Sequence, residues 1–220
     1  MRSIQEILKT NLSDFNNNEY AKKIASMDQI FNEIYRECNY SFDKGCGSYL
    51  FDGQNYEYNF AMFPKQELLY NLAKDSTSVL EIGSYMGHSI LIMLAANPKL
   101  HITSIDISNK YIVSGISVLK KYFPEAKIDF YHNDSLGILP HLTNTFDLFH
   151  IDGYHTEDYI KQEFDYCKKL VSKEKNVMRV VFDDVSCCES LVKHVANKHL
   201  CYKNIRPNCS WTNTYLEISV

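Results

Sequence analysis

VLEIGSYMGHS, residues Val79–Ser89, is the stretch that decides the fold of this chain of 220 residues. An apolar run ends in an acid, Glu81, and two glycines follow it, Gly83 and Gly87. A strand that enters a glycine turn and then a helix is typical of nucleotide-binding α/β proteins. Such turns hold a nucleotide, hold a phosphate or make only a tight turn, so the neighbouring residues must discriminate between these possibilities.

The residues around the turn argue against a phosphate ligand. A dinucleotide fingerprint requires GxGxxG, but Tyr85 takes the middle position, and no lysine follows Gly87 as a phosphate loop would require. Glu81 would repel a pyrophosphate and attract a cation. Asp106 ends the next predicted strand, where a carboxylate can accept hydrogen bonds from both hydroxyls of a ribose. A nucleoside that carries positive charge and no phosphate describes S-adenosylmethionine (SAM).

From residue 78 onward, short strands alternate with helices, which predicts a parallel sheet covered on both faces. No helix separates the last two strands, so residues 206–213 predict a hairpin and one antiparallel strand. The predicted fold is α/β, a Rossmann-like sheet of seven strands. The expected strands are 78–82, 101–106, 127–131, 146–151, 178–182, 200–205 and 213–219, and the expected helices are 87–96, 109–122, 136–142, 156–171 and 188–199.

The first 63 residues predict a helical extension on the substrate side of a SAM-binding domain that spans residues 64–220. Apolar residues from Ile24 to Tyr35 recur at helical spacing, and Pro64 opens a further helix. The loop 40–60 between them is rich in tyrosine and glycine. Two interpretations of this loop stay open: a wall or lid for the acceptor, or a packed cap without substrate contact.

Composition excludes several classes of function. The formal net charge is −4 and lysine pairs are scattered, which argues against a nucleic-acid partner. The longest apolar run, residues 90–96, is too short to span a bilayer, and the N-terminus lacks the apolar core of a signal peptide. Seven cysteines without CxxC spacing favour reduced thiols and a cytoplasmic location.

Three carboxylates end two of the later strands. Asp152 follows one strand, and Asp183 and Asp184 follow the next. Neighbouring parallel strands lie about 4.8 Å apart, so these acids should be close enough to repel one another. A divalent cation would resolve the repulsion, and no arginine or lysine nearby in the sequence offers a substitute. In the alternative interpretation, Asp184 caps the next helix and Asp183 faces water.

The stretch VLEIGSYMGHS resembles the first motif of class I SAM-dependent methyltransferases, in particular the catechol-type O-methyltransferases. TSIDIS, 103–108, is similar to the ribose-binding strand, and NDSLGILPHL, 133–142, to the segment beside the adenine. The resemblance implies Glu81 near the methionine amino group, Ser89 near its carboxylate and Asp106 on the ribose. The implied SAM-binding set is Glu81, Gly83, Ser84, Tyr85, Gly87, Ser89, Asp106, Ile107, Asp134, Ser135 and Asp152.

The resemblance also implies a metal site and a base. Metal-dependent members of the family bind Mg²⁺ with Asp from one strand end and usually Asp-Asn from the next. Here Asp152, Asp183 and Asp184 match these positions, with Asp in place of Asn, which leaves Mg²⁺, Mn²⁺ and Ca²⁺ open. His155 stands where the catechol-type enzymes carry a basic lysine, so we expect His155 and Asp152 to be catalytic. A cap or surface role is the alternative for His155.

IDGYH, residues 151–155, is similar to a branch of the family that methylates sugar hydroxyls. The expected function is therefore SAM-dependent O-methylation of a small polyol or glycan. Related enzymes often self-associate, so a homo-oligomer is a further expectation. Alternatives are a catechol or phenol acceptor, a non-catalytic SAM-binding module, and an NAD-dependent dehydrogenase. We expect His150 to be structural and His88 to line the cofactor pocket.

Overall fold

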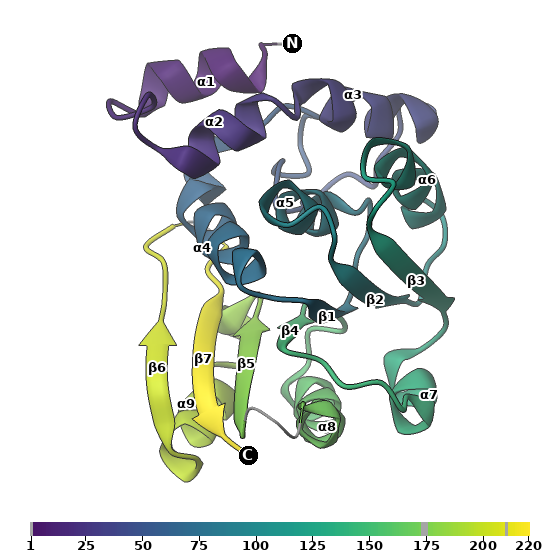
Figure 1. The fold of residues 1–220 in the computed structure, drawn as a ribbon, viewed down its shortest axis with the longest axis vertical. Coiled ribbons are helices and arrows are strands. Elements are labelled where there is room, and N and C mark those ends of the chain that lie inside the picture. Colours follow the sequence, from purple (N-terminus) through teal and green to yellow (C-terminus); the bar gives the residue numbers. More distant parts are fainter. Residues whose placement is uncertain (1, 173–175, 210) are drawn as a thin grey trace.

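The computed structural model describes residues 2–172, 176–209 and 211–220. Its centre is a seven-stranded sheet in the order β3-β2-β1-β4-β5-β7-β6 (Figure 1). β7 is antiparallel to both of its neighbours and the other pairs are parallel, which confirms the predicted sheet with one antiparallel strand. The strands are β1 Ser78–Ile82, β2 His101–Asp106, β3 Lys127–His132, β4 Leu148–Ile151, β5 Val177–Phe182, β6 Cys201–Ile205 and β7 Thr214–Ser219.

The central strands are mostly apolar on both faces because each face packs against its own layer of helices. Side chains alternate across a strand, so Val79 joins one core and Leu80 the other. The same division separates Leu148 from Phe149 in the neighbouring strand β4. The sheet is thus the middle layer of three, as expected for a mostly parallel sheet.

Helices α4 to α6 cover one face of the sheet, and α7 to α9 cover the other (Figure 1). Nearly every residue of α5 is buried, because this helix lies between the sheet and the N-terminal segment. Most helices fall within a few residues of their predicted limits. Their bounds are α4 Phe63–Lys74, α5 His88–Ala96, α6 Ile112–Tyr122, α7 Ser135–Ile138, α8 Glu157–Cys167 and α9 Glu189–Lys198.

Two helices end earlier than their patterns predict. α7 stops at Ile138 and a 3₁₀ turn, Leu139–His141, follows it, since Pro140 has no N–H to continue the helix. α8 ends at Cys167, and a second 3₁₀ turn, Lys168–Leu170, carries the chain onward. Neither change moves a strand end.

The N-terminal segment forms three short helices, α1 Ile4–Asn11, α2 Glu19–Ala25 and α3 Asp28–Glu37. Ser3 and Glu6 form a reciprocal capping box that starts α1. The buried faces of these helices share one hydrophobic core with α4, α5 and α6. The segment therefore covers the outer side of the first helix layer, as Figure 1 shows.

The strand order reverses between β1 and β4, so the connections from these two strands run to opposite sides. In open α/β sheets the crevice at such a reversal is where ligands bind, at the carboxyl ends of the strands. Within the described part of the chain, no helix is long and apolar enough to cross a membrane.

Candidate functional site

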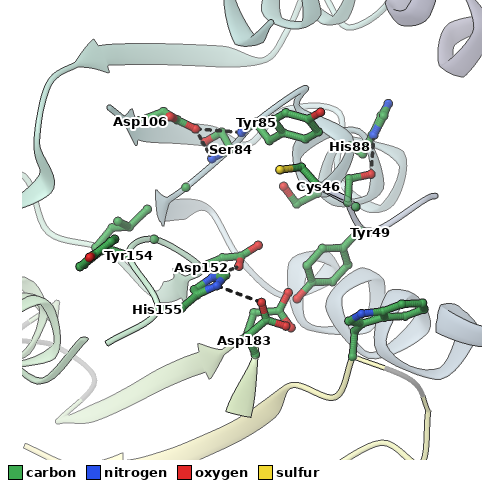
Figure 2. Close-up of a pocket in the computed structure, with 18 of the residues that line it drawn as sticks. Cys46, Tyr49, Ser84, Tyr85, His88, Asp106, Asp152, Tyr154, His155 and Asp183 are labelled. Carbon is green, nitrogen blue, oxygen red and sulfur yellow. Dashed lines mark hydrogen bonds and ion pairs between the residues drawn. The ribbon is translucent and has the colours of Figure 1, made fainter. Parts of the chain in front are cut away.

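A cavity of about 940 Å³ opens at the carboxyl ends of β1, β2, β4 and β5 (Figure 2). Loop residues from Gly45 to Gln54 form part of its wall, so the tyrosine-rich loop does face the site. Most residues expected to act lie together in this cavity. Those that line it are Gly83, Ser84, Tyr85, Ser89, Asp106, Ile107, Asp134, Ser135, Asp152, His155, Asp183 and Asp184.

The glycine turn requires glycine at position 83 because the space there excludes a side chain. Gly83 has φ of +82°, and a Cβ there would lie 1.8 Å from the carbonyl oxygen of Asp152. No side chain fits between these two strand ends, so the close approach of β1 to β4 requires glycine. Gly87, with φ of +83°, starts α5 and packs under α6 instead of lining the cavity.

Glu81 lies beneath the turn and does not line the cavity, although we expected it near the methionine amino group. Its side chain is fully buried. Oε2 accepts a hydrogen bond from the Ser84 hydroxyl at 2.7 Å, and Oε1 lies 3.1 Å from Nδ1 of His150. The alternation of β1 directs Glu81 away from the cavity. Its effect on a ligand therefore passes through Ser84.

Asp106 is held by the backbone of the glycine turn. Its Oδ2 accepts hydrogen bonds from the N–H groups of Ser84 and Tyr85, both at 2.8 Å (Figure 2). Oδ1 accepts one from the Ser108 N–H. The carboxylate at the end of β2 is therefore fixed in orientation at the cavity wall. Beside it, Ile107 is 74% exposed.

Tyr85, which replaces the middle glycine, joins the turn to the N-terminal loop. Its hydroxyl accepts a hydrogen bond from the Asp43 N–H at 2.9 Å, and its ring packs edge-on against Tyr111. Its φ is +48°, a left-handed conformation that is uncommon outside glycine. The side chain thus ties the loop wall to the turn.

The segment after β3 meets α8 at the other end of the cavity. Ser135 donates a hydrogen bond to Oε1 of Glu163 at 2.6 Å, and Tyr159 donates one to Asp134. Burial raises the pKa of Glu163 to about 7. Among the described residues, none donates a hydrogen bond to Oε2 of Glu163. Tyr154, 66% exposed, packs edge-on against Tyr159 at the cavity rim.

The three acids at the ends of β4 and β5 lie close together but face different partners. His155 stands between two of them, with Nε2 3.4 Å from Oδ1 of Asp152 and Nδ1 3.2 Å from Oδ2 of Asp184. The hydrogen bond to Asp152 and the nearby acids raise the pKa of His155. Burial and the charge of Asp183 raise the pKa of Asp152 to about 7. The expected pairing of His155 with Asp152 is therefore present.

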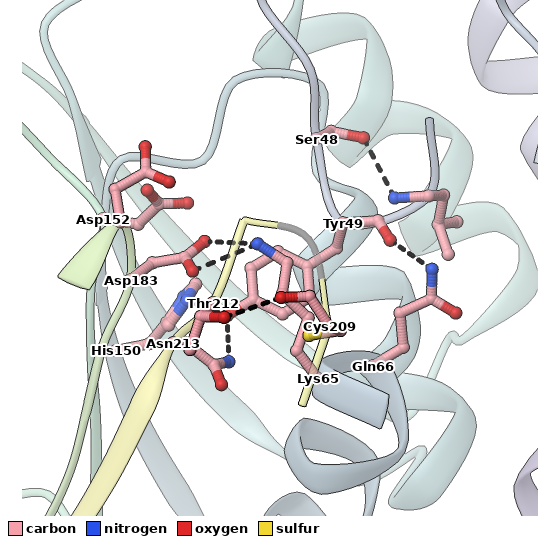
Figure 3. Close-up of polar contacts among 12 residues, drawn as sticks. Ser48, Tyr49, Lys65, Gln66, His150, Asp152, Asp183, Cys209, Thr212 and Asn213 are labelled. Carbon is pink, nitrogen blue, oxygen red and sulfur yellow. Dashed lines mark hydrogen bonds and ion pairs between the residues drawn. The ribbon is translucent and has the colours of Figure 1, made fainter. Parts of the chain in front are cut away.

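Lys65 provides the positive charge that the sequence did not reveal. Its Nζ donates hydrogen bonds to both oxygens of Asp183, at 3.1 and 3.0 Å (Figure 3). Both side chains are almost fully buried. Of the lysines that the structure describes, none nearby in the sequence serves the acids, as expected, but Lys65 is distant in sequence and reaches the sheet from α4. A detectable signal existed: Lys65 shares the apolar face of α4 with Leu69 and Leu72.

The residues that could hold the expected divalent metal are already paired with other groups of the protein. Within the described ranges, potential ligand atoms come within 4.8 Å of one another in two groups: His150, Asp152 and Asp183, and Asp152, His155 and Asp184. In the first group Asp183 is already paired with an ammonium. In the second the imidazole already bridges both carboxylates. The three acids do not form a single group of their own.

His150 is structural, as its place within a strand suggested. Its Nε2 lies 2.9 Å from the Tyr49 hydroxyl, which also accepts a hydrogen bond from Nδ2 of Asn213. Burial opposes the charged form of His150, but Glu81, Asp152 and Asp183 together outweigh it and the pKa is raised. This buried network joins the loop wall to the centre of the sheet (Figure 3).

His88 lines the cavity, as expected, but its two ring nitrogens serve the protein. They lie 2.7 Å from the Ser48 hydroxyl and 2.8 Å from the Tyr56 hydroxyl. Burial lowers the pKa of His88 to about 3, so the imidazole is neutral and holds the loop against α5.

Comparisons with known proteins agree with this geometry. Residues 80–185 match the family described as a methyltransferase domain. The O-methyltransferase hkm8 from Aspergillus hancockii is 28% identical over 107 residues, which cover 48% of this chain and 42% of the relative. The aligned region thus spans less than half the length of that curated relative.

Several solved structures share the fold. TomG from Streptomyces achromogenes, an O-methyltransferase involved in tomaymycin synthesis and solved with SAM, has a TM-score of 0.63 at 18% identity, covering 88% of this chain and 90% of its own. An O-methyltransferase from Bacillus cereus with S-adenosylhomocysteine (SAH) has a TM-score of 0.64 at 12% identity, covering 99% and 97%. At these identities the likeness is one of fold. Residues 80–185 are thus similar to a methyltransferase domain, and the chain as a whole shares its fold with solved SAM-dependent O-methyltransferases.

Proposed function

We propose that this protein transfers a methyl group from SAM to a hydroxyl oxygen of a small acceptor, a polyol such as a saccharide. One observation carries the proposal: a single cavity contains the Asp106 carboxylate, held by the glycine turn, and the His155 imidazole, held by two carboxylates. The first suits a nucleoside and the second suits a proton acceptor. Their presence in one cavity supports methyl transfer over simple nucleotide binding.

The residues of the turn and the adjoining strands would hold SAM. Asp106 suits the ribose hydroxyls, since its carboxylate is fixed at the end of β2. Ser135 and Asp134 suit the adenine, and the exposed faces of Ile107 and Tyr154 offer it apolar surface. Ser84, Ser89 and Asp152 suit the methionine end. When bound, SAM supplies a methyl group on a positively charged sulfur, which an oxygen nucleophile can attack.

His155 would act as the general base for the acceptor. A sugar or phenol hydroxyl is a weak nucleophile until its proton is removed, and a neutral imidazole can accept that proton. Asp152 and Asp184 hold the ring on both nitrogens and favour the imidazolium that proton transfer produces. The side chain is 41% exposed, so it is accessible from the cavity.

The acceptor would lie between His155 and the loop wall. Tyr49, Met62 and Trp211 line this part of the cavity, and Trp211 is 52% exposed. Aromatic faces of this kind bind sugar rings and phenols alike. The similarity of residues 151–155 to sugar-methylating enzymes favours the saccharide, and a catechol or phenol is the alternative. The proposed reaction uses no divalent metal, because the Lys65 ammonium already neutralises the Asp183 carboxylate.

An acceptor screen with methyl-labelled SAM tests the proposal. The panel should contain monosaccharides, glycosides, catechols and phenols, each with and without EDTA. The expected result is label transferred to an oxygen of a hydroxylated acceptor. SAM binding without turnover on any acceptor would indicate a non-catalytic binding module. Binding of NADH without binding of SAM would favour a dehydrogenase and reject the proposal.

A further inference from the structure

The Asp183 carboxylate at the end of β5 already contacts a cation of the protein. Lys65 extends from the first turn of α4 to the end of β5, where Nζ contacts both oxygens of Asp183. The ammonium also lies 4.4 Å from the centre of the Tyr49 ring. An ammonium over an aromatic face gains further stabilisation. Its site is therefore built from a carboxylate and a ring.

The burial of the pair makes it difficult to displace. The Lys65 side chain is 4% exposed and that of Asp183 is 5% exposed. A metal ion that took Asp183 as a ligand would leave the Lys65 ammonium without its anion. A buried unpaired charge is strongly unfavourable, more so than the loss of a surface ion pair. The helix position of Lys65 also keeps the ammonium close, since α4 packs into the same core as α5.

The two remaining acids both contact one histidine. His155 places one nitrogen near Asp152 and the other near Asp184. His150, the last potential ligand, has both ring nitrogens engaged with Glu81 and Tyr49. Every group that brings ligand atoms together in the described part of the chain thus includes a side chain that is already paired.

We infer that this site works without a divalent metal, and that Lys65 is the residue that excludes it by neutralising Asp183. Lys65 is a positioning residue, because it orients Asp183 and, with it, the acid cluster beside His155. The inference concerns the charges of the folded chain, so it does not depend on the proposed methyl transfer. It also departs from the metal dependence that the resemblance to catechol-type enzymes implies.

Titration with Mn²⁺, followed by electron paramagnetic resonance of the free ion, tests the inference without any acceptor. The wild type, in the presence of SAH at about pH 8, should leave the spectrum of free Mn²⁺ unchanged. Lys65→Met removes the charge with little change of shape and should tighten Mn²⁺ binding at least roughly tenfold. Lys65→Arg keeps a cation and should behave as the wild type. Lys99→Met, an exposed lysine paired with Glu125, is the matched control and should change nothing.

Each outcome has a defined meaning. Tight Mn²⁺ binding by the wild type that Asp183→Asn abolishes would overturn the inference. A folded Lys65→Met protein that gains no affinity would show that Lys65 is not what excludes the metal. Circular dichroism and SAH binding establish that each variant is folded, and Lys65→Gln replaces Lys65→Met if the latter is not. If the wild type does not bind SAH at all, that result counts against the proposed function and not against the exclusion of the metal by Lys65.

Discussion

Nζ of Lys65 lies 3.0 Å from Oδ2 of Asp183, although 118 residues separate the two in the sequence. One residue belongs to the helix that precedes the sheet, and the other ends its fifth strand. The ion pair therefore connects the first helix layer to the catalytic end of the sheet. It also determines the charge of the site, because it leaves Asp152 and Asp184 to His155.

Breaking this pair from the acidic side should destabilise the fold. Asp183→Asn leaves a buried ammonium without its counter-charge, which costs about 3–5 kcal/mol of unfolding free energy. Asp165→Asn removes one partner of an exposed pair with Lys161 and should cost at most about 1 kcal/mol. Urea unfolding of both variants measures the difference. Equal losses of unfolding free energy in the two variants would show that the buried ion pair contributes no more to stability than the exposed one.

The contact between Gly83 and Asp152 predicts strict intolerance to a methyl group. Gly83→Ala places Cβ 1.8 Å from a backbone oxygen at positive φ, so β1 and β4 must separate. We expect loss of at least about 3 kcal/mol of stability and loss of SAM binding. Gly137→Ala is the control, since its Cβ would meet nothing closer than 3.8 Å. A Gly83→Ala protein with normal stability and affinity would contradict the close approach of the two strands.

Asp106 should contribute mainly to SAM affinity. Asp106→Ala removes the acceptor of three backbone hydrogen bonds and the proposed partner of the ribose. We expect the Kd for SAM, measured by calorimetry, to rise by roughly a hundredfold, which corresponds to about 3 kcal/mol. Asp129→Ala removes an acid on β3 outside the cavity and should leave Kd unchanged. Unaltered affinity in Asp106→Ala would place SAM elsewhere.

His155 should affect transfer and not cofactor binding. His155→Ala is expected to lower kcat by about 10²–10⁴ with any acceptor found in the screen, because general-base catalysis contributes that much. Its Kd for SAM should stay within about twofold of the wild type. His141→Ala, outside the cavity, serves as control. If His155→Ala retains the wild-type kcat, His155 is not the general base.

Glu163 predicts a specific dependence of stability on pH. In the unfolded chain this carboxyl ionises near 4.5, but in the fold its pKa is about 7 because it is buried. The folded state therefore retains the proton longer, and the unfolding free energy should fall as pH rises from about 4.5 to about 7, by up to roughly 3 kcal/mol. Above that range the contribution is constant.

Glu163→Gln should remove this part of the pH dependence, because the amide does not ionise. Comparing the unfolding free energy of wild type and variant at about pH 5 and about pH 8 isolates the effect. Glu125→Gln, an exposed acid paired with Lys99, should retain the wild-type slope. If the unfolding free energy of Glu163→Gln changes with pH as much as that of the wild type, the Glu163 carboxyl does not cause the pH dependence.

The sequence by itself determined the sheet and the location of the site. Alternating strand and helix patterns, the Gly83 turn and the acids Asp106 and Asp152 at strand ends are local features, and strand ends of a parallel sheet always meet at one edge. Even the single antiparallel strand followed from a missing helix between two strand patterns.

Only the tertiary structure decided how the charges are paired. Whether an acid meets a metal or an ammonium depends on which helix faces it, and Lys65 reaches Asp183 only because α4 packs beside the end of β5. The pairing of Glu81 with His150, its register partner on the neighbouring strand, likewise depends on which strands lie side by side. These relationships join residues that are distant in the chain, and electrostatic energy depends on their separation in space and their burial, which no local pattern records.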